Sequence, residues 1–539
     1  MRHLDSTGSR AADVRPQADP AYLQFLGARP GLASLALGVV SATGFRPLCL
    51  WPLALLAMGC FAQLVARSKG WRQAAWLGWV FGVGHFTLGN NWIATAFTYQ
   101  SNMPAILGWA AVPLLSLYLA LFPALAAGLA RLVAGGRTDW AFALALSATW
   151  IVGEWMRSWV LTGYAWNPFG IIFLGPFDRP GLAAIAPWLG TYALSGLAVL
   201  VSTALVLVLL ERRFLVAAIA ALLLAAGMYW PAGPGREGTL AVTIVQPDLT
   251  QERLNSPLFY EANYQRLARL SRPREPGERR LVLWPESGLV DYLREGYPQR
   301  YYDHTTASGD PVFARRRIGL AIGRGSVLMT GAVDLEIENG GAAGAYNSVT
   351  SLDSEGNIIG GYAKAHLVPF GEFLPFRALL EPIGLSRLVP GSLDFIAGPG
   401  PRTLDLGDHG RAGVQICYEI VFSGQVADRD ERPDYIFNPS NDGWFGAFGP
   451  PQHLAQARLR AIEEGLPVLR ATTTGISAVI DPRGVVRAHR PLHVLDRIDA
   501  VVPPALPPTL FARLGNALPL IWAALLLGGT AIAIKRRPR

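Results

Sequence analysis

Three segments of the chain each end an apolar run with a side chain that can take part in covalent chemistry. The run from Leu281 to Glu286 ends in a carboxylate, Gly361 to Lys364 ends in an ammonium group, and Gly413 to Cys417 ends in a thiol. Short apolar runs of this kind predict β-strands. A strand that stops on a thiol holds the sulfur at the rim of a sheet, where backbone N–H groups can meet a developing oxyanion. Together the three groups are the parts of an acyl-transfer centre.

In such a centre Cys417 attacks, Glu286 takes the thiol proton, and Lys364 stabilises the thiolate and the oxyanion. Each residue also has a plainer interpretation when it is viewed singly. A free cysteine is usually a small buried hydrophobe, Glu286 could be a surface carboxylate at a strand end, and Lys364 a solvated hairpin lysine. The other two cysteines, Cys49 and Cys60, lie in an early apolar stretch. A lone thiol in the polar part, facing an oxidising compartment, favours a reactive role.

The composition indicates an integral membrane protein. Of the 539 residues, 51% are hydrophobic and only 16% are charged, and the mean hydropathy is +0.28; soluble chains carry roughly 25% charged residues. The net charge is +8, but the basic residues fall in short clusters beside apolar spans rather than on one continuous face. This distribution indicates membrane topology and speaks against nucleic acid as a partner.

Eight apolar stretches are candidates for membrane-spanning helices. They lie near residues 31–45, 48–66, 74–97, 105–133, 139–158, 190–210, 213–231 and 515–534. The first is short for a bilayer that needs roughly 20 apolar residues, and its boundary with the second is a tight hairpin at Arg46 and Pro47.

Basic residues predict the orientation of these spans. One side holds Arg67, Lys69, Arg72, Arg131, Arg137, Arg212, Arg213, Lys535, Arg536, Arg537 and Arg539, whereas the opposite loops hold Arg46, Arg157 and Arg179. The positive-inside rule then places both termini in the cytoplasm. We therefore predict a cytoplasmic tail over residues 1–30, seven helices over 31–231, an outer domain over 232–514, and a last helix with a basic tail over 515–539.

The outer region has the pattern of one α/β domain. Its strand-like runs are Leu240–Val245, Leu281–Trp284, Val327–Val333, Tyr346–Leu352, Ile358–Ala363, Ala412–Cys417, Tyr435–Asn438, Val468–Thr472 and Ser477–Ile480. Amphipathic helices are predicted over Pro257–Leu270 and Pro451–Glu464. About 280 residues suffice for a single domain with a substantial core.

The order Glu286, Lys364, Cys417 resembles the catalytic triad of the nitrilase superfamily, and the segment from Lys364 to Glu372, Lys-Ala-His-Leu-Val-Pro-Phe-Gly-Glu, is very specific to it. Seven spans before the domain and one after it resemble the membrane-embedded branch of that superfamily, the apolipoprotein N-acyltransferase family. The resemblance covers roughly residues 31–534.

This resemblance implies a four-layer αββα sandwich beside a domain of about eight transmembrane helices. It implies that Glu372 supports the triad, that the backbone N–H of Tyr418 helps to form the oxyanion hole, and that Glu419 orients the loop. Further matches are Asn438–Gly446, the pair Gln452 and His453, the Arg470-Ala-Thr segment and Leu161–Trp166. Among these, we expect Trp166, Asn441 and Trp444 to contact substrate.

Two departures from the family pattern concern the substrate-binding loops. The usual tryptophan shortly after the Val-Gln-Pro strand is missing, and Gln251, Glu252 and Arg253 stand there. Thr473 and Thr474 replace a more common pair of asparagines.

The implied reaction is a two-stage acyl transfer in a bacterial inner membrane, with the catalytic domain in the periplasm. Cys417 takes a fatty-acyl chain from a phospholipid as a thioester, and the amino group of a diacylglyceryl-cysteine on an apolipoprotein then takes the chain as an amide. We expect a monomer without a cofactor, and no metal, because the histidines are scattered without ligand spacing.

Two other functions are compatible with parts of the pattern. A membrane-tethered amidase or nitrilase would use the same triad on small soluble substrates without lipid. A receptor or transporter with a ligand-binding outer domain would keep its function when Cys417 is replaced by alanine, and it would carry paired charges deep in the spans, of which the sequence offers few.

Overall fold

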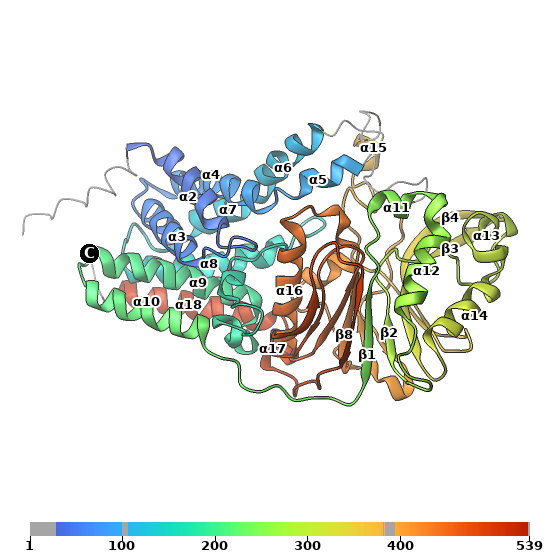
Figure 1. The fold of residues 1–539 in the computed structure, drawn as a ribbon. Coiled ribbons are helices and arrows are strands. Elements are labelled where there is room, and N and C mark those ends of the chain that lie inside the picture. The colour runs from blue at the N-terminus through green and yellow to red at the C-terminus, as the bar shows by residue number, and fades with distance from the viewer. Residues whose placement is uncertain (1–27, 100–105, 381, 383–393, 537–539) are drawn as a thin grey trace, which may run out of the picture.

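The computed structural model describes residues 28–99, 106–380, 382 and 394–536. A bundle of helices lies on one side of the molecule and two β-sheets with their covering helices lie on the other (Figure 1). Most of the predicted amino-terminal tail, residues 1–27, and the last three residues of the basic tail lie outside the described part of the chain.

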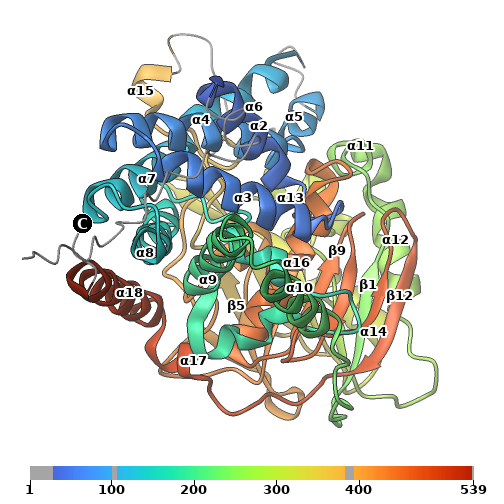
Figure 2. The same cartoon turned by 90° about the vertical axis from the view of Figure 1, so that its left-hand side faces the viewer.

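The bundle contains a helix wherever the sequence predicts an apolar span. Its helices are α2 (Pro30–Ala42), α3 (Trp51–Ala66), α4 (Trp71–Gly89), α5 (Ile93–Ala96), α6 (Ile106–Leu119), α7 (Leu121–Val133), α8 (Trp140–Arg157), α9 (Ala186–Leu210), α10 (Phe214–Tyr229), α17 (Leu510–Leu514) and α18 (Ala517–Arg536). Although α18 comes from the far end of the chain, it packs against α8 and α9 on the outside of the bundle (Figure 2).

Three segments of the described chain are long and apolar enough to cross a membrane by themselves: Ile106–Val133, Leu182–Leu210 and Ala517–Arg536. The apolar helices α2, α3 and α10 are shorter. The number of eight crossings therefore stays a prediction.

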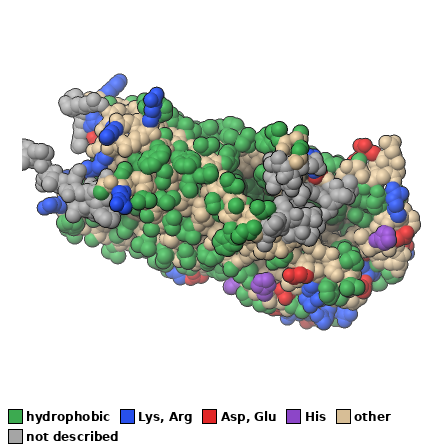
Figure 3. Space-filling view, turned by 90° about the horizontal axis from the view of Figure 1, so that it is seen from above, with side chains coloured by type: hydrophobic (Ala, Val, Ile, Leu, Met, Phe, Trp, Pro, Cys, Tyr) green, Lys and Arg blue, Asp and Glu red, His purple; other side chains and the backbone are tan. Residues whose placement is uncertain are grey.

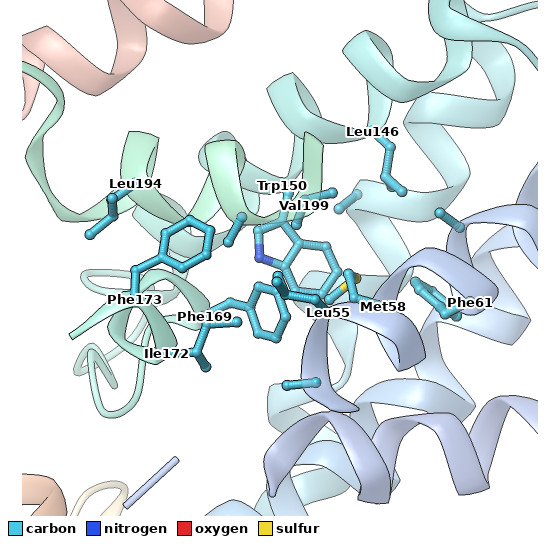
Figure 4. Packing of buried hydrophobic residues seen from close by; sticks show 14 of the residues in the cluster. Leu55, Met58, Phe61, Leu146, Trp150, Phe169, Ile172, Phe173, Leu194 and Val199 are labelled. Atoms are coloured by element: carbon cyan, nitrogen blue, oxygen red, sulfur yellow. The ribbon is translucent and has the colours of Figure 1, made fainter. Parts of the chain in front are cut away.

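The interior of the bundle is formed by apolar side chains from several helices and from one loop. Phe169, Ile172 and Phe173 lie in the loop between α8 and α9, and their rings and methyl groups pack among Trp150 of α8 and Leu55 of α3 (Figure 4). This loop closes the end of the bundle that faces the sheets, because α16 of the sandwich packs on the same cluster.

The outer surface of the bundle is also apolar. Figure 3 shows hydrophobic side chains over most of the face of the bundle that is in view, with lysine and arginine gathered at the end of the bundle away from the sheets. Exposed leucines and tryptophans such as Trp109 and Leu222 contribute to this surface. A helix that is apolar on all sides is typical of a membrane environment.

The sandwich consists of two six-stranded sheets. The first has the order β12 (Asp496–Val501), β1 (Ala241–Gln246), β2 (Leu281–Leu283), β3 (Val327–Glu338), β4 (Gly341–Leu352) and β5 (Ile358–Ala363). The second has the order β11 (Val486–Arg490), β10 (Ser477–Ile480), β9 (Val468–Thr472), β8 (Tyr435–Ser440), β7 (Arg411–Val414) and β6 (Thr403–Asp405). In each sheet the central strands are parallel and the outer strands are antiparallel.

Alternation along the strands explains the layers. In β2, Leu281 and Leu283 point between the two sheets, while Val282 points outward. The outer face of the first sheet is covered by α12 (Tyr260–Leu270) and α14 (Pro311–Ile322), and that of the second by α16 (Gly449–Glu464). Since successive side chains of a strand point to opposite faces, each sheet buries both faces. The predicted αββα sandwich is confirmed.

Helix α16 belongs to both halves of the molecule. One of its faces packs on the second sheet through Leu454, Ala457 and Ala461, and another packs on the bundle through Ala455 and Leu459. Shorter helices complete the outer region: α11 (Gln251–Asn255), α13 (Gln299–Thr305) and α15 (Arg377–Leu380).

The predicted strands are present, with one difference that matters for the site. The strand predicted to run to Cys417 ends at Val414, because the chain turns before the thiol. Strands β6, β11 and β12 and helix α14 are additions that the sequence pattern did not indicate.

Candidate active site

Cys417 begins a tight turn just beyond the end of β7. Its backbone has a φ of +51°, and residues Cys417–Val421 form a 3-10 helix. A non-glycine residue in the left-handed region costs roughly 1–2 kcal/mol. The Glu419 side chain accepts the Ile416 N–H at 2.8 Å, and the Glu419 N–H donates to the Ile416 carbonyl at 3.1 Å. These bonds hold the turn in shape, so the thiol leaves the sheet at its carboxyl edge.

Lys364 follows β5 and lies between two carboxylates. Its Nζ is 2.9 Å from Oε1 of Glu372 and 3.5 Å from Oε1 of Glu286. All three side chains are buried; that of Lys364 is 1% exposed. The predicted base and cation are therefore brought together, with the supporting carboxylate that the resemblance implied.

Asn347, in the middle of β4, joins the two carboxylates and was not predicted from the sequence. Its Nδ2 donates to Glu286 at 2.7 Å and to Glu372 at 2.8 Å. The second oxygen of Glu286 accepts the Asn441 N–H at 2.8 Å, and that of Glu372 accepts the Val368 N–H at 2.8 Å. Both carboxylates are thus fixed by donors on each oxygen.

The electrostatics keep Lys364 charged and Cys417 protonated. Burial lowers the pKa of Lys364, but Glu372 and then Glu286 outweigh it and raise the pKa well above its usual range. Burial raises the pKa of the Cys417 thiol, and the nearby Glu286 carboxylate raises it further, against the opposing effect of Lys364. A thiol that is not ionised at rest needs a base in order to attack. Among the carboxylates, Glu286 has the largest effect on the pKa of this thiol.

Glu419 ties the turn at Cys417 to the first sheet. Its Oε1 accepts the Tyr362 hydroxyl at 2.8 Å and the N–H groups of Ala365 and His366 at 2.8 and 3.1 Å. Burial raises the pKa of Glu419 to about 7, although the bound N–H groups act against this shift. The segment after Lys364 and the segment before Cys417 are thereby linked through one side chain.

The residues expected to contact substrate lie in different surroundings. Asn441 is buried beside Glu286. Trp444 is partly exposed, with its ring 5.7 Å from that of Tyr99. Trp166 is fully buried between the bundle and α16, where its indole N–H donates to Gln452 at 2.8 Å. Contact of these residues with substrate stays a prediction. The side chain of Trp166 has no exposed surface in this structure.

Residues at both departures from the family pattern form hydrogen bonds to the same atom. Gln251 Nε2 and Thr473 Oγ1 each donate to Oδ1 of Asn441 at 2.8 Å. The Asn441 backbone N–H in turn donates to Glu286. Side chains at both departures therefore help to hold Asn441, which in turn holds Glu286.

Comparison with protein families matches both halves of the chain. Residues 37–204 match the model of the apolipoprotein N-acyltransferase N-terminal domain, and residues 242–498 match the carbon-nitrogen hydrolase model.

Relatives match over nearly the whole length. A protein of Rhodopseudomonas palustris named apolipoprotein N-acyltransferase is 34% identical over 95% of this chain and 96% of its own. A protein of Bradyrhizobium diazoefficiens with the same name is 36% identical over 95% of this chain and 97% of its own. Among solved structures, an amidase of the nitrilase superfamily from Nesterenkonia is 17% identical, with a TM-score of 0.34, and covers 50% of this chain and 94% of its own.

Proposed function

Since this chain belongs to the apolipoprotein N-acyltransferase family, we propose that it N-acylates apolipoproteins through a thioester on Cys417. Family membership makes it an acyltransferase and a bacterial membrane protein. The observation that carries the mechanism is the buried pair of Glu286 and Lys364, 3.5 Å apart, whose charges shift the pKa of the buried Cys417 thiol in opposite directions. We propose Cys417, Glu286 and Lys364 as the catalytic residues.

In the first stage Glu286 takes the thiol proton as the sulfur attacks the acyl ester of a phospholipid. The tetrahedral oxyanion receives the Lys364 ammonium and the Tyr418 backbone N–H, which follows the nucleophile at the start of a helical turn. The C–O bond breaks, Glu286 returns the proton to the departing lysophospholipid oxygen, and a thioester remains.

In the second stage the amino group of a diacylglyceryl-cysteine attacks the thioester. Glu286 accepts a proton from the nitrogen, the C–S bond breaks, and the proton returns to the sulfur. The product is an amide, and the enzyme regains its thiol. All the proposed catalytic residues come from one chain, so we expect a monomer to suffice.

We further propose eight membrane-crossing helices, both termini in the cytoplasm, and the sandwich in the periplasm, with the domain limits expected from the sequence. The apolar surface of the bundle and its basic end, opposite the sandwich, support this arrangement (Figure 3). The bundle would hold the thiol at the bilayer surface, where both lipid-anchored substrates have a high effective concentration.

The test is to incubate the purified protein with a phospholipid that is labelled in its acyl chains and to search for acyl-Cys417 by mass spectrometry. We expect a labelled adduct that disappears when a diacylated lipopeptide is added, and no adduct with Cys417→Ala. If the lipopeptide gains a third chain while Cys417 stays unlabelled, the thioester mechanism is wrong. Amide hydrolysis of small substrates without lipid, and without any adduct from phospholipid, would instead indicate a tethered amidase.

A further inference from the structure

Three buried residues that have no role in the proposed mechanism contact one another, and one of them contacts the backbone of Cys417. Arg470 of β9, Asp442 of the turn after β8 and His453 of α16 are all buried, with exposures of 0 to 2%. Arg470 donates to both oxygens of Asp442 at 2.8 and 2.7 Å. Nδ1 of His453 lies 3.0 Å from Asp442 and 3.0 Å from Arg470, and its Nε2 lies 3.0 Å from the Cys417 carbonyl oxygen.

These contacts determine which nitrogen of His453 carries a proton. A carbonyl oxygen only accepts hydrogen bonds, so Nε2 must be protonated to approach the Cys417 carbonyl at 3.0 Å. A neutral His453 satisfies this with Nδ1 accepting from Arg470, and a cationic His453 satisfies it with Nδ1–H donating to Asp442. Burial and then the Arg470 charge lower the pKa of His453, which favours the neutral form. In both forms Nε2–H donates to the Cys417 carbonyl.

The acceptor of this bond belongs to a peptide unit that matters for the reaction. The Cys417 carbonyl and the Tyr418 N–H lie in one rigid plane and point in opposite directions. Fixing the oxygen therefore fixes the direction of the N–H, and a hydrogen bond to the oxygen also polarises the N–H. A second donor, Nδ2 of Asn438, lies 3.5 Å from the same oxygen.

We infer that His453 is a positioning residue that holds the peptide between Cys417 and Tyr418 so that its N–H points at the oxyanion. This inference rests on the proposed function, because it assigns the Tyr418 N–H to the oxyanion of the acylation step. Asp442 and Arg470 hold the imidazole, and the rings of Trp166 and Phe445, at 5.3 and 5.5 Å, enclose it.

Replacing His453 by glutamine or by asparagine distinguishes the positioning role from a merely structural one. The amide nitrogen of glutamine is as many bonds from Cα as Nε2 of histidine, so His453→Gln can still donate to the Cys417 carbonyl. The amide nitrogen of asparagine corresponds to Nδ1, so His453→Asn can contact Asp442 but cannot reach the carbonyl.

The experiment measures two rates on the full-length protein for each variant: formation of acyl-Cys417 from a labelled phospholipid, and alkylation of Cys417 by iodoacetamide. Alkylation uses the same sulfur but creates no oxyanion. For His453→Asn we expect acylation to fall about 10²-fold, the lower end of the effect of losing an oxyanion donor, while alkylation changes by less than about threefold. For His453→Gln we expect most of the acylation rate to remain.

Equal loss of acylation and alkylation in His453→Asn, or an acylation rate in that variant as high as in His453→Gln, would overturn the inference while the wild-type adduct still supports the thioester mechanism. Absence of an adduct in the wild-type protein would overturn both. Loss of both rates in both variants would show that His453 serves folding alone.

Discussion

Two buried clusters of charge flank Cys417, and they differ in their balance. In the cluster of Lys364, Glu286 and Glu372, one ammonium group faces two carboxylates. In the cluster of Arg470, Asp442 and His453, one guanidinium faces one carboxylate, and burial together with the Arg470 charge lowers the pKa of the imidazole. A balanced buried cluster is suited to fixing geometry, whereas an excess of negative charge beside a thiol keeps the proton on the sulfur until the base removes it. In the proposed mechanism, therefore, the first cluster moves protons and the second holds the peptide between Cys417 and Tyr418.

The largest effect is expected from removing the base of the unbalanced cluster. Glu286→Gln keeps the size and shape of the side chain, but an NH2 group replaces one of the two oxygens that accept hydrogen bonds. The amide cannot accept the thiol proton. We expect acyl transfer to a diacylated lipopeptide to fall by about 10³-fold or more, within the range for loss of a general base. Gain of the third chain on the lipopeptide is followed by mass spectrometry. Asp442→Asn is the matched control in the other cluster, and an equal loss there would erase the distinction between the clusters.

The second largest loss of acyl transfer is expected for Lys364→Met, which leaves two buried carboxylates without their cation. Acyl transfer should fall by about 10²- to 10³-fold, as for the loss of an oxyanion donor.

Glu286→Gln and Lys364→Met should shift the pKa of the Cys417 thiol in opposite directions. Glu286 raises the pKa of Cys417 and Lys364 lowers it. The pH midpoint of alkylation by iodoacetamide should therefore fall in Glu286→Gln and rise in Lys364→Met. Glu286→Gln would then carry the more easily ionised thiol and yet transfer acyl chains far more slowly than the wild-type protein. Shifts in the same direction for both variants would contradict the charge assignment.

Breaking the balanced cluster should affect stability more than chemistry. Asp442→Asn leaves Arg470 without its carboxylate, and loss of one partner of a buried ion pair costs about 3–5 kcal/mol. We expect the apparent Tm in detergent to drop clearly. The acylation rate of the folded protein should fall by less than about tenfold, because neutral His453 keeps its Nε2–H toward Cys417. A normal Tm together with a loss of acylation as large as in Glu286→Gln would reverse the roles of the clusters.

The smallest effects are expected between the clusters, at Asn441. Gln251→Leu and Thr473→Val each remove one of the two side-chain donors to Oδ1 of Asn441. Either change alone should therefore lower acyl transfer by only about two- to threefold. The double variant leaves Asn441 with the Gly443 N–H at 3.3 Å, and its loss should exceed the product of the single losses, because neighbouring sites couple. Strict multiplicativity would show that the two side chains act independently.

The sequence allowed the central strands and the three catalytic candidates to be predicted, since an apolar run such as Leu281–Leu283 is typical of a strand that is buried on both faces. The edge strands β11 and β12 carry several charged residues and lack a continuous apolar run. They form strands because they pair with their neighbours in the sheet. Asn347 gave no signal, because a single polar residue in a strand acquires its meaning only when Glu286 and Glu372 arrive from elsewhere in the chain.

The turn at Cys417 illustrates the same limit on a smaller scale. The run Gly413–Ile416 predicts a strand up to the thiol, but the positive φ of Cys417 depends on bonds from Glu419 and His453 that no local pattern contains. His453 itself was recognised only as a match to the family, and its contact with Cys417 needed coordinates.

Helix α16 connects the turn at Cys417 to the helical bundle. Its first turn carries His453, which contacts Cys417, and Gln452, which bonds to Trp166, to Asn167 and to the Arg46 carbonyl. Two turns later Arg458 donates to the carbonyls of Gly175, Pro176 and Arg179 in the loop of the bundle. In the proposed topology this bracing keeps the sulfur at one height above the bilayer. The enzyme would then select substrates by the distance between the amino group and its lipid anchor. It would acylate an amino group directly beside the anchor and not one on a longer tether.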